Sequence, residues 1–363
     1  MAVDSTALLT ALQAVIDPNT GQDFVSTKAL KNLSEQYGEV AFDVELGYPA
    51  KSQVEPLRAA LVAAAKAVPG VDKVNANITF KIAAHAVQRG VQLLPGVRNI
   101  IAVASGKGGV GKSTTAANLA LALAAEGATV GILDADIYGP SQPMMMGLEG
   151  RPESLDGKTM EPLVNHGVQV ISIGFLVNKD DAMVWRGPMA TQALEQLLRQ
   201  TNWKDLDYLI VDMPPGTGDI QLTLSQRVPL TGAVIVTTPQ DIALLDARKG
   251  IKMFEKVGVP ILGIVENMAV YCCPNCGHTE HIFGEDGGKK MATEFEMDYL
   301  GALPLNMQIR VQADGGAPTV VAEPEGEIAG LYRAVARQLA VKVAKQAKDF
   351  SSKFPAIKIS KDT

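Results

Sequence analysis

One short segment constrains the fold of this chain more than any other: Gly-Lys-Gly-Gly-Val-Gly-Lys-Ser, at residues 106–113. It fits the pattern G-x-x-x-x-G-K-S/T, and it lies between a β-branched run at residues 100–104 and a helical pattern at residues 112–126. Glycines let the backbone of such a loop approach a ligand closely, and the N–H groups that open the following helix bind negative charge. A chance glycine-rich turn does not require this order of strand, loop and helix. The segment therefore predicts a phosphate-binding loop in an α/β fold.

After this loop the chain alternates between short apolar runs and helical patterns. Further strands are predicted at residues 129–133, 168–173, 208–211, 233–237 and 261–265, and further helices near residues 188–200, 219–227 and 242–257. Short apolar strands that alternate with helices are typical of a parallel sheet covered on both faces. We therefore predict a mostly parallel α/β domain over residues 98–348, which ends in a basic amphipathic helix over residues 328–348.

A second, smaller α/β domain is predicted at residues 1–88. Its order is helix, turn, strand, helix, strand, with helices at 5–16 and 54–68 and strands at 39–46 and 74–80. Gly90, Pro95 and Gly96 break regular structure and predict a linker over residues 89–97. The polar residues 349–363 are expected to form a loose tail.

Composition excludes several classes of protein. The 363 residues are 47% hydrophobic, which is enough for the cores of two domains. A formal net charge of -6 argues against a nucleic-acid-binding protein. No apolar run approaches the roughly 20 residues needed to span a bilayer, and no basic segment followed by an apolar one opens the chain. We expect a cytoplasmic protein with no nucleic-acid partner and no membrane span.

Acidic residues follow two of the predicted strands. Asp134 and Asp136 lie in Leu-Asp-Ala-Asp-Ile-Tyr-Gly-Pro-Ser, and Asp212 opens Asp-Met-Pro-Pro-Gly-Thr-Gly-Asp. Ligands of open parallel sheets gather at the carboxyl ends of the strands. A lone Asp is often a turn or capping residue, but two acidic strand ends in series with the loop indicate phosphoryl transfer to an oriented water. In that chemistry Lys112 would reach the outer phosphates and Ser113 would bind Mg²⁺.

All 3 cysteines lie in one stretch, Cys272, Cys273 and Cys276. The C-x-x-C turn from Cys273 to Cys276 aims two thiolates at one point, which suits a metal or a cluster. Zinc and [4Fe-4S] sites usually take four protein ligands, and a two-fold symmetric dimer would supply the second pair. A redox C-x-x-C and a zinc site completed by His278 or His281 remain open as alternatives. The side chain of Cys272 diverges from that of its neighbour and is expected to be a spectator.

The loop carries a second lysine, Lys107, and so resembles the deviant Walker A family. That family includes the MinD/ParA partitioning ATPases, nitrogenase iron protein and the Mrp/ApbC-type iron–sulfur carriers. The extra lysine of the family reaches the nucleotide across a dimer interface, so the resemblance implies an ATP-linked homodimer. The alternative for Lys107 is a solvated lysine at the loop edge.

Four motifs together make the resemblance more specific. The loop, the two aspartate motifs and Glu-Asn-Met followed by Cys-Pro-Asn-Cys-Gly resemble the Mrp/ApbC carriers over residues 98–345. The N-terminal domain resembles the small domain often fused to bacterial members, and it has no cysteine with which to hold a cluster. The doubled Cys272-Cys273 departs from the family pattern and leaves open which thiol of that pair is a ligand.

The resemblance implies roles for individual residues. Lys107 and Lys112 would act at the reaction centre, and Asp136 resembles the catalytic switch aspartate. Asp212 resembles the Walker B aspartate that holds Mg²⁺ through water, and Asp134 would be a Mg²⁺ or structural partner.

Other implied contacts surround the nucleotide. Gly216 resembles the glycine that senses the γ-phosphate, and Asn267 resembles the asparagine that recognises the base. The remaining nucleotide-binding residues implied by the loop are Gly106, Gly108, Gly109, Val110, Gly111, Ser113 and Thr114.

The function implied by the resemblance is that of an ATP-hydrolysing carrier. It would use ATP and Mg²⁺, bind a [4Fe-4S] cluster between two subunits at Cys273 and Cys276, and pass the cluster to apo iron–sulfur proteins. One alternative is a MinD/ParA-type positioning ATPase, for which the basic helix at 328–348 would bind a membrane or DNA, but that function leaves the C-x-x-C unexplained. The other is an assembly factor that binds zinc and ATP.

Overall fold

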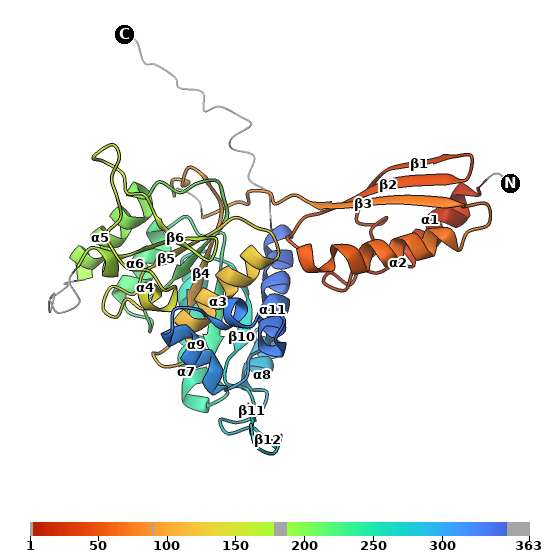
Figure 1. The fold of residues 1–363 in the computed structure, drawn as a ribbon. Coiled ribbons are helices and arrows are strands. Elements are labelled where there is room, and N and C mark those ends of the chain that lie inside the picture. The colour runs from red at the N-terminus through yellow and green to blue at the C-terminus, as the bar shows by residue number, and fades with distance from the viewer. Residues whose placement is uncertain (1–2, 89–90, 178–186, 347–363) are drawn as a thin grey trace, which may run out of the picture.

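The computed structural model describes residues 3–88, 91–177 and 187–346. Its first part is a three-stranded sheet with the order β1-β2-β3 and two helices (Figure 1). The elements are α1 (Ser5–Gln13), β1 (Leu30–Gln36), β2 (Glu39–Leu46), the short helix η1 (Lys51–Gln53), α2 (Val54–Lys66) and β3 (Lys73–Phe80). Strand β2 alternates fully between buried and less buried positions, which puts Val40, Phe42 and Val44 in the core.

Strand β1 was not among the strands predicted from the sequence. This strand reads Leu-Lys-Asn-Leu-Ser-Glu-Gln and has no fully buried residue. It pairs antiparallel with β2 at the edge of the sheet, with an irregularity between Lys31 and Ser34. An exposed edge strand buries too little apolar surface to produce a clear alternating pattern, so only its pairing with β2 identifies it.

The second part is built on an eight-stranded sheet with the order β13-β10-β9-β4-β8-β5-β7-β6. Its strands are β4 (Val97–Ala104), β5 (Val130–Asp134), β6 (Leu163–Asn165), β7 (Val168–Ser172), β8 (Leu206–Asp212), β9 (Gly232–Thr237), β10 (Ile261–Glu266) and β13 (Tyr299–Ala302). All neighbouring pairs are parallel except β6 and β7. The predicted fold class, a mostly parallel sheet with a small additional α/β domain, is confirmed.

Helices cover both faces of this sheet. They are α3 (Lys112–Ala125), α4 (Gln142–Met145), α5 (Gly187–Gln200), α6 (Asp219–Arg227), α7 (Asp241–Lys256), α8 (Gly287–Glu294), α9 (Met307–Asp314), α10 (Thr319–Ala322) and α11 (Glu327–Ala344), with a short helix η2 (Ile173–Phe175). In β4, Ile101 and Val103 face the core beneath α3 and α11, whereas Ile100 and Ala102 face the core beneath α5, α6 and α7. A strand buried on both faces explains why the predicted strands read as continuous apolar runs.

Helix α11 is part of the fold. It packs against α3, β10 and β13, and it buries Tyr332, Leu339 and Val343 among other residues. The basic helix predicted at 328–348 therefore uses its apolar face inside the protein, and its last residues, 347 and 348, lie outside the described residues. None of the helices in the described part of the chain has the length and apolar character that spanning a bilayer requires.

The two domains meet along α11 and the end of α3 (Figure 1). The carboxylate of Glu126, directly after α3, is 1% exposed and forms an ion pair of 2.6 Å with Arg337 of α11. It also accepts hydrogen bonds from the backbone N–H and the hydroxyl of Ser52, at 2.9 and 2.7 Å. Through Glu126, the small domain thus contacts the end of α3, the helix that follows the phosphate loop.

The connection between the domains differs slightly from the predicted linker. Strand β4 begins at Val97, which pairs with Leu206, so the strand takes the last residue of the predicted linker over residues 89–97. The segment before the linker already touches the large domain, because the side chain of Gln88 donates to the carbonyl of Ser225 at 2.8 Å. The predicted tail at 349–363 lies outside the described residues.

Candidate functional site

The predicted phosphate loop connects the carboxyl end of β4 to the start of α3. Gly109 and Gly111 have φ values of 84° and 80°, in the left-handed region that favours glycine. Gly111 is the residue that caps α3, and its carbonyl accepts the first helical hydrogen bond from the N–H of Thr115 at 2.9 Å. The free N–H groups of the first turn of α3 therefore adjoin the loop, as binding of an anion requires.

Glycine is needed at two positions of the loop because neighbouring groups are close. A Cβ on Gly106 would overlap the backbone carbonyl of Asp246 in α7, and a Cβ on Gly111 would overlap the side-chain amide of Asn267. By contrast, a Cβ on Gly108 would have no neighbour nearer than Pro215 at 4.0 Å, and one on Gly109 would have none within 4 Å. The loop is therefore closely packed at Gly106 and Gly111 and has open space beside Gly108 and Gly109, as a phosphate-binding loop requires.

Lys112 lies at the centre of a buried polar cluster. Its ammonium group forms an ion pair with the carboxylate of Asp212, and the side chains are 6% and 0% exposed. The same ammonium lies 3.1 Å from the hydroxyl of Ser113. Of the other loop residues, Val110 is buried and Thr114 is partly exposed, with its carbonyl accepting from the side chain of Asn118. The cluster brings together the lysine, serine and aspartate that the sequence predicted.

Asp134 and Asp212 lie side by side because β5 and β8 are adjacent, and the two residues are register partners. Asp134 is fully buried, and it accepts hydrogen bonds from the hydroxyl of Ser172 at 2.9 Å and from the backbone N–H of Gln142 at 3.1 Å. Burial, together with the negative charge of Asp212, raises the pKa of Asp134. Two neighbouring carboxylates offer the oxygen ligands that Mg²⁺ prefers.

Two other predicted residues adjoin this cluster. Asp136 is partly exposed, and its backbone N–H donates to the carboxylate of Asp134 at 3.2 Å. Burial raises the pKa of Asp136, while the charge of Lys112 opposes the shift. Gly216 has a φ of 92°, and its N–H donates to the carbonyl of Ser105 at 3.1 Å, directly before the phosphate loop. The structure therefore brings both predicted switch residues to the loop.

Gln142 and Ser172 belong to the cluster but were not predicted. The side-chain amide of Gln142 donates to Asp212 at 2.9 Å and to the carbonyl of Ser113 at 3.1 Å, so it links the two acidic strands to the loop. The only sequence signal for Gln142 is its position directly after the Asp-Ala-Asp-Ile-Tyr-Gly-Pro-Ser motif. Ser172 ends a strand with no motif of its own, so only the pairing of β5 with β7 identifies it.

Asn267 follows β10 and also contacts the loop. Its side-chain amide donates to the carbonyl of Val110 at 2.9 Å, and the residue is 7% exposed. Lys107 is partly exposed, and its carbonyl accepts from the hydroxyl of Ser105 at 2.8 Å. The ammonium of Lys107 has no hydrogen-bond or ion-pair partner among the described residues, so it is available to a ligand or to a second subunit.

The cysteines lie in a small hairpin that follows β10. Strands β11 (Tyr271–Cys272) and β12 (Thr279–Glu280) pair antiparallel and enclose the C-x-x-C turn. The turn is closed by hydrogen bonds from the N–H of Gly277 to the carbonyl of Cys273, at 2.9 Å, and from the N–H of Cys273 to the carbonyl of His278, at 2.8 Å. The three thiols are free, and those of Cys272 and Cys276 belong to exposed residues.

The environment of Cys273 favours the thiolate. Hydrogen bonds from the backbone N–H groups of Asn275 and Cys276, followed by the Cys276 thiol, lower the pKa of Cys273. A thiolate is the form that binds metals and clusters. The thiol of Cys272 donates instead to the carbonyl of Gly277, at 3.7 Å, and is not among the groups that lower the pKa of Cys273. The C-x-x-C pair therefore presents its sulfur atoms to solvent at an accessible turn.

A zinc site within one chain is not formed. The described residues, which include Cys273, Cys276 and both nearby histidines, contain no group of three or more His, Cys, Asp or Glu side chains that could hold a metal ion. His281 instead contacts the carbonyl of Ala269 through Nδ1 at 2.9 Å, which ties the hairpin to the end of β10. Among the described residues, neither His278 nor His281 therefore forms a three-ligand group with the two cysteines.

Known families match both parts of the chain. Residues 96–340 match the family model described as NUBPL iron-transfer P-loop NTPase. Residues 5–78 match the model described as iron-sulfur cluster assembly protein. The second match lies within the small domain, and the first begins at the end of the predicted linker.

Similar proteins support the same relationship. An iron-sulfur cluster carrier protein from Escherichia coli K12 is 52% identical over 330 residues, which are 91% of this chain and 88% of that protein. One from Pseudomonas fragi is 61% identical over 74% of this chain and 94% of its own length. The mouse iron-sulfur cluster transfer protein NUBPL is 55% identical over 68% of this chain and 78% of its own length.

Solved structures support the fold. A nucleotide-binding protein from Archaeoglobus fulgidus, solved in complex with ADP, is 39% identical, has a TM-score of 0.56, and covers 64% of this chain and 90% of its own. The cell division ATPase MinD from Pyrococcus furiosus has a TM-score of 0.51 at 23% identity, over 66% of this chain and 98% of its own, and shows the fold alone.

Proposed function

The chain belongs to the family of NUBPL-type iron-transfer P-loop NTPases, and from that premise we propose that it is an ATP-hydrolysing carrier that binds one [4Fe-4S] cluster between two subunits and delivers it to apo iron–sulfur proteins. One observation supports this most strongly. A pair of free thiols on an accessible turn and a phosphate loop follow parallel strands of one sheet at their carboxyl ends, so the proposed cargo site and nucleotide site share an edge.

The proposed nucleotide site uses the buried polar cluster. Phosphates would lie against the backbone N–H groups of the loop and the first turn of α3, and Lys112 would contact their outer oxygens. Ser113, Asp134 and Asp212 would hold Mg²⁺, which neutralises phosphate charge when bound. Lys112 is paired with Asp212, so the residue that would contact the phosphates is linked directly to a residue that would hold Mg²⁺.

Asp136 is the group proposed to orient the attacking water. It is partly exposed, and its backbone N–H donates a hydrogen bond to the carboxylate of Asp134. Gly216 would sense the outer phosphate because its N–H contacts Ser105, directly before the loop. Asn267 would keep its amide nitrogen on Val110 and offer its oxygen to the base. These contacts connect the nucleotide to β10 and hence to the cysteine hairpin.

Exposed apolar side chains support a homodimer. Ile242 and Leu245, in the first turns of α7, are 69% and 57% exposed. The next residue, Asp246, contacts Gly106 of the loop. A second subunit that covers these side chains would lie near Lys107 and would contribute the second pair of cysteines. We also propose the cytoplasm as the location of the protein, with apo iron–sulfur proteins and no nucleic acid as its partners.

The proposal is tested by anaerobic reconstitution of the full chain with iron and sulfide. We expect a visible absorption band of a [4Fe-4S] cluster with one cluster per two chains. Cys273→Ala and Cys276→Ala should each abolish the band, whereas Cys272→Ala should retain it, because Cys272 belongs to β11 and precedes the C-x-x-C turn. A colourless protein with tightly bound zinc, or equal loss in all three variants, would refute the proposed cluster site.

A further inference from the structure

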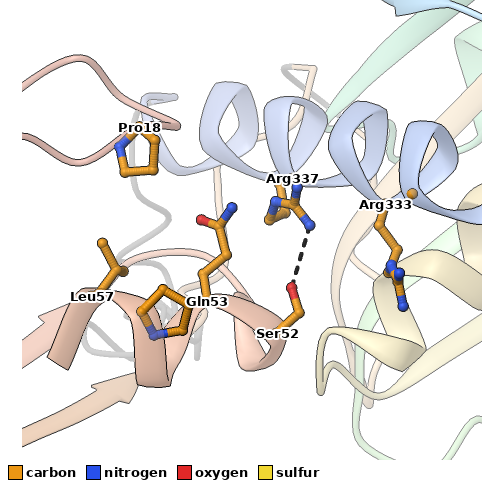
Figure 2. Close-up of a pocket in the computed structure, with 8 residues that line it drawn as sticks. Pro18, Ser52, Gln53, Leu57, Arg333 and Arg337 are labelled. Atoms are coloured by element: carbon orange, nitrogen blue, oxygen red, sulfur yellow. Dashed lines mark hydrogen bonds between the residues drawn. The ribbon is translucent and has the colours of Figure 1, made fainter. Parts of the chain in front are cut away.

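A pocket of 310 Å³ lies between the small domain and α11 (Figure 2). This volume is at the lower end of the range of small-ligand sites, about 300–1,000 Å³, and such sites often lie between domains. Eight residues line it: Pro18, Ser52, Gln53, Pro56, Leu57, Gly330, Arg333 and Arg337. Neither the phosphate loop nor the cysteine hairpin contributes to it, so it is separate from the site described above.

The two arginines are one helical turn apart on α11. In Figure 2 Arg337 extends toward Ser52 of the small domain, whereas Arg333 lies on the other side of Arg337 from Gln53. Arg337 uses Nη1 for Glu126, at 2.6 Å, and Nε for the side-chain oxygen of Asn19, at 3.3 Å. Within the described part of the chain, Nη2 of Arg337 makes no hydrogen bond, and the guanidinium of Arg333 has no partner at all. Since arginine stays charged at any physiological pH, Arg333 brings an uncompensated positive charge to the pocket.

The small domain adds a further donor from the opposite wall. Gln53 directly precedes α2, and its side chain makes no capping hydrogen bond to that helix. Its side-chain oxygen accepts from Asn19, which leaves the amide nitrogen without an acceptor among the described residues. Figure 2 shows Gln53 facing the side of the pocket where Arg337 lies. Donors from two domains thus line one pocket.

The remaining lining defines what kind of anion fits. None of the eight lining residues is acidic. Glu126, the ionic partner of Arg337, is 1% exposed. Pro18, Pro56 and Leu57 form an apolar wall beside the donors. An inorganic anion would fill only the polar end, whereas a carboxylate on a short apolar body would contact both parts. Arginine forks match carboxylate geometry well.

We propose that this interdomain pocket binds a carboxylate carried on a short apolar body, which is either a small free acid or the C-terminal residue of a peptide. The free Nη2 of Arg337 and the amide nitrogen of Gln53 donate to the carboxylate, the positive charge of Arg333 attracts it, and the apolar wall contacts the body. Binding would also join the two domains, because its contacts come from α11 on one side and from the segment around α2 on the other.

Calorimetric titration of the full chain tests this proposal with three probes. They are N-acetyl-Leu-Leu with a free carboxylate, the same peptide as its C-terminal amide, and 4-methylpentanoate as a small free acid. The peptide acid should bind at least about tenfold more tightly than the amide, because the amide loses its charge-assisted hydrogen bonds. Tighter binding of 4-methylpentanoate than of the peptide acid would identify a small-acid site, and the reverse order would identify a peptide site.

Variants show whether the probe occupies this pocket. Arg333→Gln should weaken binding of the acid at least about tenfold, and the isosteric Gln53→Glu should weaken it through charge repulsion. Arg310→Gln removes the same charge from an exposed pair with Asp314 on α9 and should leave binding unchanged. Equal affinity for acid and amide, equal binding to wild type and Arg333→Gln, absence of binding at millimolar probe, or equally tight binding of inorganic phosphate would each overturn the proposal.

Discussion

The phosphate cluster and the cysteine hairpin follow strands of the same sheet, but they are built in opposite ways. Lys112, Asp134 and Asp212 are buried and already hydrogen-bonded to one another or to Gln142 within one chain. Cys273 and Cys276 lie on an accessible turn and find no further metal-binding side chain in the described part of the chain. A site formed in advance suits repeated chemistry on a bound substrate, whereas an open, incomplete site suits a cargo that must enter and leave.

The largest loss of activity is expected from a substitution at the centre of the phosphate cluster. Lys112→Ala removes the charge that would contact the outer phosphates, so ATP turnover should fall by a factor of about 10²–10³ or more. Turnover is measured by phosphate release at saturating ATP and Mg²⁺. Lys204→Ala, which removes an exposed lysine paired with Glu161, is the matched control and should retain turnover. Unchanged turnover in Lys112→Ala would show that the reaction centre lies elsewhere.

The packed and open sides of the loop should differ in their tolerance of a methyl group. Gly106→Ala forces a Cβ onto the carbonyl of Asp246 and should destabilise the protein by about 3 kcal/mol. Gly108→Ala places its methyl in open space and should cost far less. Chemical unfolding of the two variants gives the comparison. Equal stability would mean that α7 does not hold the loop as described.

The contacts of Glu126 between the small domain and α11 should contribute less to the free energy of unfolding than the packing of the phosphate loop. Glu126→Gln leaves Arg337 without its ionic partner and should lower the free energy of unfolding by about 2 kcal/mol. Glu39→Gln removes one partner of an exposed pair with Lys73 and should have little effect. Limited proteolysis should cut the interdomain segment of Glu126→Gln faster than that of wild type. Equal rates and equal stability would contradict a role for Glu126 at the interface.

The smallest expected effect is a change in pH dependence. The pKa of Asp134 is raised in the folded protein, so folding favours the protonated carboxyl group. The stability that this protonated group contributes is lost as the pH rises above the ordinary pKa of 3.8 and through the folded pKa. Asp134→Asn cannot titrate. Its unfolding temperature should therefore fall less than that of wild type between mildly acidic and neutral pH, without nucleotide. Parallel profiles for the two proteins would contradict the raised pKa.

The sequence predicted the parts of the molecule whose residues are tied to local geometry. Gly109 and Gly111 need left-handed backbone, and the continuous apolar run of β4 needs two covered faces, so both could be recognised from spacing and composition. Gln142 could not be recognised, because its role depends on bringing β8 and the loop together. The same holds for the pair of Glu126 and Arg337, which lie 211 positions apart. The exposed edge strand β1 could not be predicted either, because it has no alternating apolar pattern.

For the cysteine hairpin, neither the sequence nor the fold of one chain identifies a complete set of ligands. Its spacing indicates a metal or cluster, and neither His278 nor His281 forms a three-ligand group with it among the described residues. The described residues present two free thiols on an accessible turn, one with a lowered pKa, and no third metal-binding side chain beside them. Two such hairpins, related by a two-fold axis, would satisfy the usual four-ligand requirement.

Native mass spectrometry of the anaerobically reconstituted full chain tests this claim most directly. The account predicts a species with the mass of two chains plus a single [4Fe-4S] cluster, and Cys276→Ala should yield no cluster-bound dimer. A single chain that carries a complete cluster, or a dimer that carries two clusters, would contradict it.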